Sequence, residues 1–371
     1  MHDDDLISLM RYLNFRQPIF LMALASACFI SGCSTSGNLT GTGDLGKSNK
    51  VAYSIVYVIH GDAGYLYHDS LGTARQADEE VLSEAIRVGE QAKNGEVLIF
   101  HQRPERKILW LFPKKDRRFL FYRGGKLISN KRYSPSLETG AGIFSAEARL
   151  FNDYGGAMDS NGNSIFLYFG HEIPYKNGKG YYRSLPGQAM TTDTFSAGIH
   201  SMLPDSRQRF DLIVLSTCNN ATPDMVHALK PFTGHLLASP QNLHLSHIDT
   251  EKLAMLENNP AAEPGQVADT LSLHTYRRLT KTVETVVSLS IFDMQEVDSY
   301  IHQVDSTYRS YLKTGSPADP GSENTDCINL SIFENQAIFA KGVKSRYRPP
   351  RFGRKADRKI HSGWGCKERK P

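Results

Sequence analysis

The segment 210–240 constrains the fold more than any other part of the sequence, because it switches between two kinds of secondary structure. It begins with a short apolar run, 212–215, which is typical of a strand buried on both faces. A helix is expected from Thr222, a favoured N-cap residue that is followed by Pro223. A second short strand is expected over 235–239. This strand–loop–helix–strand unit predicts an α/β fold with an open, mostly parallel sheet.

Cys218 lies where the first of these strands ends, and ligands of such sheets bind beyond the carboxyl ends of the strands. A nearby helix N-terminus and an adjacent imidazole would both stabilise a thiolate there. The alternative is a small buried thiol, which is a common fate of cysteine. Polar residues on both sides of Cys218 favour a reactive cysteine.

Further buried strands are expected over 53–60, 97–101 and 164–170. A helix whose acidic first turn is 77–80 is expected between the first two strands, so these two strands should be parallel. Additional helices are expected over 137–154, 194–202 and 266–282, with a strand over 286–291. An antiparallel edge or insertion is expected from strands over 108–112, 119–122 and 127–128, with a hairpin turn at 123–126.

Two histidines follow predicted strands and are candidates for a general base beside Cys218. His171 follows the strand 164–170, and His60 ends the strand 53–60. A histidine at a strand end can also be a plain loop residue, and that alternative stays open.

The quoted segments resemble the clostripain-like (C11-type) cysteine peptidases of the caspase-like clan over about residues 51–310. In that family a strand ends in an acid–small–Cys triplet, and a later strand ends in Ala-Ser. Here Thr217-Cys218 and Leu237-Ala238-Ser239 correspond to these positions, and Gly61-Asp62 corresponds to a Gly-Asp after the first strand. The resemblance implies a three-layer α/β/α sandwich with a mostly parallel central sheet. It also implies a Cys–His dyad.

The same resemblance implies roles for individual residues. Cys218 is the nucleophile and His171 the base, which the family order favours over His60. The N–H of Glu172 would bind the oxyanion, although the family usually has glycine there. Ser216 stands where members that cleave after Arg or Lys often have Asp, so a basic substrate side chain would need another partner, such as Asp249 or Glu251. Calcium is possible through the resemblance only, and no other cofactor is expected.

The N-terminus is predicted to be a targeting segment. An apolar run over 19–29 follows Arg11 and Arg16, is too short to span a bilayer as an ordinary helix, and ends near Cys33. This pattern resembles a bacterial lipoprotein signal over 1–32, with Cys33 acylated and 33–50 as a flexible tether. The residue after Cys33 is serine, which favours the outer membrane of a Gram-negative bacterium. The alternatives are an ordinary cleaved secretory signal and a short anchor helix.

The rest of the chain divides into a peptidase domain over 51–315 and a C-terminal extension over 316–371 with a basic tail. The tail is interpreted as solvated, with contact to anionic head groups as the alternative. A formal charge of +4 is small for 371 residues and gives no reason to expect nucleic acid as a partner. Pairing of Cys327 with Cys366 would leave Cys218 as a thiol, whereas a bridge to Cys218 would exclude catalysis.

Three functions are compatible with these residues. The first is a membrane-anchored cysteine endopeptidase that cleaves a peptide or protein substrate through a thioester. The second is a catalytically degenerate, caspase-like lipoprotein that acts as a binding or scaffolding module in the cell envelope. The departures at Glu172 and Ser216 favour it. The third is an esterase or amidase that uses the same dyad.

Overall fold

The computed structural model describes most of the chain beyond residue 49. The described residues are 50–61, 65–68, 72–103, 106–108, 112–114, 117–134, 142–156, 158–176, 178, 188–203, 207–243, 246–302, 306, 341–353 and 356–357. They all belong to one unit that spans Lys47–Pro371. The predicted boundary between residues 315 and 316 lies outside them and stays a prediction.

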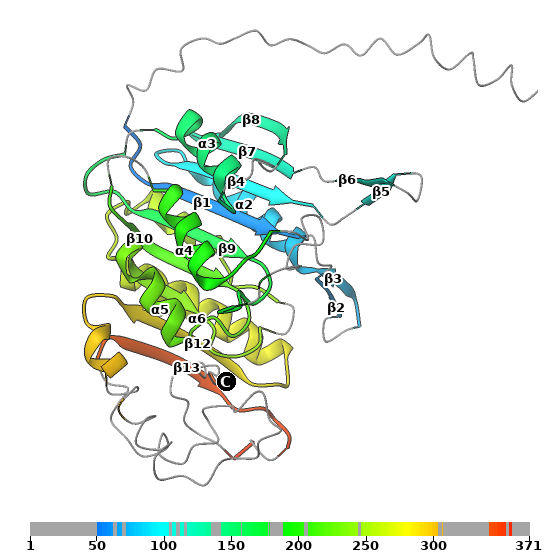
Figure 1. Ribbon diagram of the computed structural model, residues 1–371, viewed down its shortest axis with the longest axis vertical. Helices are drawn as coiled ribbons and strands as arrows, with labels where there is room; N and C mark the ends of the chain where they lie inside the picture. Colours follow the sequence, from blue (N-terminus) through cyan, green and yellow to red (C-terminus); the bar gives the residue numbers. More distant parts are fainter. Residues whose placement is uncertain are drawn as a thin grey trace, which may run out of the picture. The chain divides into compact units, whose positions relative to one another are not determined.

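A nine-stranded sheet forms the centre of this unit, in the order β13-β12-β11-β10-β9-β1-β4-β7-β8 (Figure 1). Its five middle strands are parallel to one another. They are β11 (Thr233–Ala238), β10 (Phe210–Ser216), β9 (Ser164–Phe169), β1 (Ser54–His60) and β4 (Glu96–Gln102). Almost every residue of β1, β4, β9 and β10 is buried, which confirms that these apolar runs are interior strands.

Antiparallel strands complete both sides of the sheet. On one side β4 pairs with β7 (Arg117–Arg123), which forms the predicted hairpin with β8 (Lys126–Tyr133). On the other side β11 pairs with β12 (Val287–Asp293), and β12 pairs with β13 (Val343–Arg348). The basic residues of the predicted tail begin at residue 344. The expectation that this tail is solvated is wrong for β13, because six register pairs join this basic strand to β12.

Two small ribbons lie outside the central sheet. One pairs β2 (Leu66–His68) with β3 (Ala74–Gln76), and the other pairs β5 (Arg106–Ile108) with β6 (Phe112–Lys114). The predicted single strand over 108–112 is wrong, because Ile108 pairs with Phe112 across the second ribbon.

Helices cover both faces of the sheet and make three layers (Figure 1). One face packs against α3 (Ser145–Tyr154), α4 (Thr192–Ser201) and α5 (Pro223–Leu229). The opposite face packs against α2 (Ala77–Gln91), α6 (Pro264–Thr282) and the 3-10 helix η4 (Glu251–Glu257). We call the core on the first face the α4-side core and the core on the second face the α2-side core.

Local capping explains where two of these helices begin. The hydroxyl oxygen of Thr222 accepts a hydrogen bond from the N–H of Met225 at the start of α5, as the sequence predicts. At α4, Thr191 and Thr194 form a reciprocal capping box. Helix α5 therefore starts at a fixed point shortly after β10, and α4 starts at a fixed point within the longer connection from β9 to β10.

The direction of the strand order reverses between β1 and β9. From β1 the chain crosses through α2 to β4, whereas from β9 it crosses through α4 to β10 and through α5 to β11. Right-handed crossovers in opposite directions place α2 on one face and α4 and α5 on the other. Such a reversal opens a crevice at the carboxyl ends of the strands, where open α/β sheets bind ligands. Among the described residues, no helix is both long and apolar enough to cross a bilayer.

Candidate active site

His171 and Cys218 leave neighbouring parallel strands at the same level. The last register pair of β9 and β10 joins Phe169 to Ser216. His171 and Cys218 each follow this pair by two residues. Because neighbouring strands lie about 4.8 Å apart, the two chains leave the sheet side by side with the histidine and the cysteine at equivalent positions.

Both side chains belong to the same face of the sheet. Cys218 is half-buried and packs against the α2-side core. The imidazole of His171 lies with its centroid 4.7 Å from the ring of Tyr65, which is itself part of that core. Tyr65 follows β1, so the histidine lies at the reversal between β1 and β9. The predicted pair thus shares a strand level and a face.

His60, the alternative base, belongs to the opposite face. It is only 2% exposed and contacts Phe144 and Tyr168 of the α4-side core. Its Nδ1 lies 3.0 Å from the hydroxyl of Tyr168. Burial, together with the nearby positive charge of Arg117, holds the pKa of His60 well below the ordinary value of a histidine. The sheet therefore separates His60 from the face that carries Cys218.

Two side chains join the loop after Cys218 to the loop after His171. The Nδ2 of Asn219 donates to a carboxylate oxygen of Glu172 at 2.7 Å. The amide of Asn220 accepts from the N–H of Ile173 at 2.9 Å and donates to the carbonyl oxygen of Ile173 at 3.0 Å. Asn219 has a φ of +53°, a left-handed conformation that asparagine tolerates better than most residues. These contacts extend the pairing of β9 and β10 beyond the strands.

The sulfur of Cys218 has two partners that the sequence analysis did not single out. It lies 3.0 Å from Oδ1 of Asn242, and the N–H of Leu243 donates to it at 3.3 Å. Both residues follow β11, the parallel neighbour of β10. No motif marks these two residues, so the sequence could have indicated them only through their position after the end of a third parallel strand. The N-terminus of helix α5, which was expected to stabilise a thiolate, begins only at Pro223.

The two candidate residues for substrate specificity, Ser216 and Asp249, already form hydrogen bonds with other residues of this chain. Ser216 is buried, and its hydroxyl oxygen accepts from the N–H of Ile248 at 2.8 Å. Asp249 accepts from Nε of Arg278 at 2.6 Å. Glu251, the other acid considered, forms an exposed ion pair with Arg87. The alternative partners for a basic substrate side chain are thus paired with arginines of this chain.

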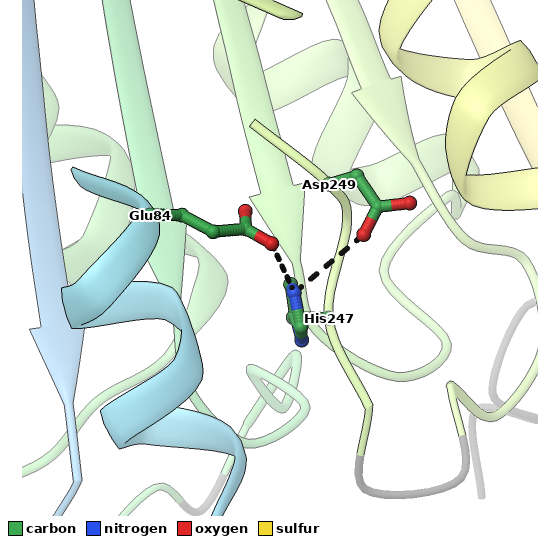
Figure 2. Close-up of side chains that lie close together, drawn as sticks. All are labelled: Glu84, His247 and Asp249. Atoms are coloured by element: carbon green, nitrogen blue, oxygen red, sulfur yellow. Dashed lines mark hydrogen bonds and ion pairs between the residues drawn. The ribbon is translucent and has the colours of Figure 1, made fainter. Parts of the chain in front are cut away.

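Asp249 is part of a buried polar cluster that joins α2 to the segment 246–250 (Figure 2). The Nε2 of His247 lies 2.9 Å from Oε1 of Glu84 and 3.6 Å from Oδ1 of Asp249. Burial by itself raises the pKa of Glu84, but hydrogen bonds from His247 and Thr250 bring it below the ordinary value. Burial raises the pKa of Asp249 despite the nearby Arg278.

The ligand atoms of Glu84, His247 and Asp249 lie within 4.8 Å of one another, which is close enough for them to share a metal ion. The arrangement fits a cation poorly, because the guanidinium of Arg278 already bonds the carboxylate oxygen that faces His247. The same guanidinium donates to the hydroxyl of Ser246 and to the carbonyl oxygen of His247. We therefore interpret the cluster as a structural network that fixes the segment 246–250.

Three cysteines of the sequence analysis lie outside the described residues. They are Cys33, Cys327 and Cys366. The predicted lipid attachment and the predicted pairing of the two C-terminal cysteines stay predictions. Cys218 itself carries a thiol.

Comparison with solved structures finds similar chains among known proteases. The chain is similar to a secreted C11 cysteine protease from Bacteroides thetaiotaomicron in complex with an irreversible peptide inhibitor, with 13% identity, a TM-score of 0.50 and 71% of each chain covered. A structure of the secreted C11 protease "iotapain" from the same organism has 12% identity and a TM-score of 0.48, covering 71% of this chain and 72% of the other. An inactive zymogen C11 protease from Parabacteroides distasonis has 10% identity and a TM-score of 0.44, covering 72% and 68%.

No family model and no curated protein matches the sequence. The first structural similarity establishes the predicted fold: a caspase-like three-layer sandwich around a mostly parallel sheet. At this level of sequence identity the similarity supports a conclusion about the fold only. Any activity has to be argued from the residues at the carboxyl ends of β9 and β10.

Proposed function

We propose that this chain is a cysteine endopeptidase in which Cys218 is the nucleophile and His171 the general base. The observation that supports it is the equal offset of the two residues from the register pair Phe169–Ser216, on the same face of the sheet. The hydrogen bonds that Asn219 and Asn220 make to the loop after His171 support it further, because they hold the two loops against each other.

The proposed reaction has two halves. His171 takes the proton of the Cys218 thiol, and the sulfur attacks the peptide carbonyl carbon to form a tetrahedral intermediate. The intermediate collapses to a thioester as the imidazolium returns the proton to the leaving amine. A water molecule, deprotonated by the imidazole, then attacks the thioester carbonyl and releases the acid and the thiol.

The developing oxyanion needs donors close to the attacked carbonyl. We assign this role to the backbone N–H groups of Cys218 and Glu172, which follow the two strand ends. The Glu172 carboxylate would oppose a negative charge, but its hydrogen bond to Asn219 fixes where that carboxylate lies. Removing one donor of an oxyanion hole costs about 10²–10³ in kcat.

The first experiment compares wild type, Cys218→Ala and His171→Ala on a mixed peptide library, with products read by mass spectrometry. Cys218→Ala should abolish cleavage while the protein remains folded. His171→Ala should lower kcat by at least about 10²-fold. His60→Asn is the matched control, since it removes a histidine from the opposite face, and it should retain cleavage. Equal cleavage by wild type and Cys218→Ala contradicts the proposal.

A thiol-directed probe separates this function from a binding or scaffolding role. Near neutral pH, selective labelling of Cys218 that depends on His171 supports the peptidase. A Cys218 thiol that reacts no faster than a simple thiol, together with a lack of cleavage, would favour the degenerate lipoprotein. Activity on esters or simple amides without peptide cleavage would favour the third function.

We further propose that the substrate residue before the cleaved bond is uncharged. Ser216 offers no negative charge, and Asp249 is paired with Arg278. A library with every residue type at that position tests this, and a strong preference for Arg or Lys would contradict it.

We also propose that a lipid on Cys33 anchors the chain at the outer membrane. Its support is the sequence pattern of residues 1–33. Cys33→Ser should move the protein out of the membrane fraction and remove the lipid mass from its N-terminal peptide. Unchanged fractionation of Cys33→Ser would contradict the anchor.

A further inference from the structure

The environment of the Cys218 sulfur contains a fixed hydrogen-bond donor. The N–H of Leu243 donates to the sulfur at 3.3 Å. Leu243 is only 3% exposed and packs in the α2-side core, so its backbone is held in place. A hydrogen bond donated to a charged sulfur is stronger than one donated to a neutral thiol, and it therefore favours the deprotonated form.

The side-chain amide of Asn242 is the second partner. Its Oδ1 lies 3.0 Å from the sulfur and accepts from the S–H group of the resting thiol. A primary amide carries an acceptor oxygen and a donor nitrogen on the same carbon. In the observed orientation the amide therefore stabilises the neutral thiol. After rotation of the Asn242 side chain by half a turn, Nδ2 would donate to the sulfur and stabilise the thiolate once the proton has left.

Hydrogen bonds hold the start of the segment 241–243, which carries both partners of the sulfur. The hydroxyl of Ser239 donates to the carbonyl oxygen of Gln241 at 2.6 Å, and Ser239 is completely buried. The same carbonyl oxygen accepts from the N–H of Asn219 at 3.1 Å. Because Asn219 directly follows Cys218, this bond ties the segment 241–243 to the loop that holds the sulfur.

We propose that Asn242 and the N–H of Leu243 form a cradle for the sulfur of Cys218 that favours its deprotonated state. The S–H bond breaks, the electron pair stays on sulfur, and the proton moves to the imidazole of His171, so no charge is gained or lost by the pair. The cradle rests on the proposed function in taking Cys218 as the nucleophile and His171 as the base.

The test measures the pKa of the Cys218 thiol in the full chain. The rate of alkylation by iodoacetamide is followed from pH 5 to pH 10, with the label on the Cys218 peptide quantified by mass spectrometry. Asn242→Asp can accept but cannot donate, and it adds a negative charge next to the sulfur. We expect it to raise the thiol pKa by about one unit or more, which corresponds to a roughly tenfold smaller thiolate fraction near neutral pH.

A second variant removes both functions of the amide without adding charge. Asn242→Leu should raise the thiol pKa by less than Asn242→Asp does, because it removes the amide without adding a negative charge; the N–H of Leu243 remains in both variants. Asn259→Asp is the matched control, since it makes the same charge change at an exposed asparagine that follows η4. It should leave the alkylation profile unchanged.

The outcomes distinguish the cradle from the proposed function. If Asn242→Leu folds and titrates like wild type, the cradle is wrong, whatever the protein cleaves, because the added charge of Asn242→Asp raises the thiol pKa by itself. If both variants raise the thiol pKa but wild type cleaves no peptide, the cradle holds and the peptidase proposal fails. Melting temperatures of all variants verify that each profile comes from folded protein.

Discussion

Asn220 pairs with the backbone of Ile173 as another strand would. Its Oδ1 accepts from the N–H of Ile173 at 2.9 Å, and its Nδ2 donates to the carbonyl oxygen of Ile173 at 3.0 Å. Both residues are buried, at 2% and 3% exposure. The side-chain amide thus continues the β9–β10 pairing past the strand ends and holds the His171 loop against the Cys218 loop.

Asn220→Ala should separate these loops. It leaves the buried N–H and carbonyl of Ile173 without this partner, and each such group costs about 1–3 kcal/mol. We expect the free energy of unfolding to fall by about 2–4 kcal/mol, and the selective labelling of Cys218 to decline in molecules that remain folded. Chemical denaturation and the thiol probe measure the two effects.

Asn163→Ala is the control for this prediction. Asn163 is equally buried and donates two hydrogen bonds, to the carbonyl oxygens of Pro260 and Ala262. It precedes β9 at the end of the strand far from His171. Its replacement should cost similar stability and leave labelling intact. If both variants lose labelling in proportion to stability, Asn220 has no special role in the site.

Tyr65 should influence the protonation of His171. The two ring centroids are 4.7 Å apart with an interplanar angle of 40°. An aromatic ring attracts a neighbouring cation by about 0.5–2 kcal/mol, so it favours the imidazolium. Tyr65→Leu should lower the pKa of His171 by up to about one unit, whereas Tyr65→Phe should preserve it. An NMR titration of the His171 ring measures this, and equal titration in both variants would refute the idea.

The central strands were predictable because their signals are local. The apolar runs of β1, β9 and β10 and the Thr222 cap of α5 need only neighbours in sequence, and the structure confirms them. The expected parallel pairing of β1 and β4 is confirmed too. From strand order it also followed that Cys218 and His171 would come to the same end of the sheet.

Other features depend on contacts between distant segments. β13 alternates Lys and Arg with Val, Ser and Tyr, which is a weak strand pattern in a basic segment, and its place in the sheet comes from its pairing with β12. The sulfur partners Asn242 and Leu243 meet Cys218 because β11 lies next to β10. In the same way, Asp249 is paired by Arg278, which lies on a different element, α6.

Arg278→Ala should destabilise the fold in a pH-dependent way. It leaves the carboxylate of Asp249 buried without its cation, and breaking a buried pair costs about 3–5 kcal/mol. Because Arg278 is itself partly exposed, we expect about 2 kcal/mol near neutral pH. Burial already raises the pKa of Asp249, and losing the arginine raises it further. A raised folded-state pKa favours the fold at low pH, so the penalty should shrink as pH falls and Asp249 becomes protonated.

Denaturation of the Arg278→Ala variant at pH 7 and pH 4 checks this prediction. Arg87→Ala is the control, because Arg87 pairs with Glu251 where both side chains are about half exposed. Exposed pairs contribute about 0–1 kcal/mol. If Arg278→Ala costs as little stability as Arg87→Ala, or costs the same at pH 7 and at pH 4, the cluster does not hold the segment 246–250.

His60 should make the fold sensitive to mild acid. Burial lowers its pKa in the folded protein well below the ordinary value, so below about pH 6.5 the unfolded chain binds a proton that the folded chain does not. Stability then rises with pH in that window, and it falls by up to about 1.4 kcal/mol for each unit of pH decrease until the folded-state pKa is reached. His60→Asn removes the ionisable group and should flatten this part of the stability profile. His200→Asn, which replaces an exposed histidine of α4, is the control for histidine content. If the stability of His60→Asn falls with decreasing pH as steeply as that of wild type, His60 is not the source of the acid sensitivity.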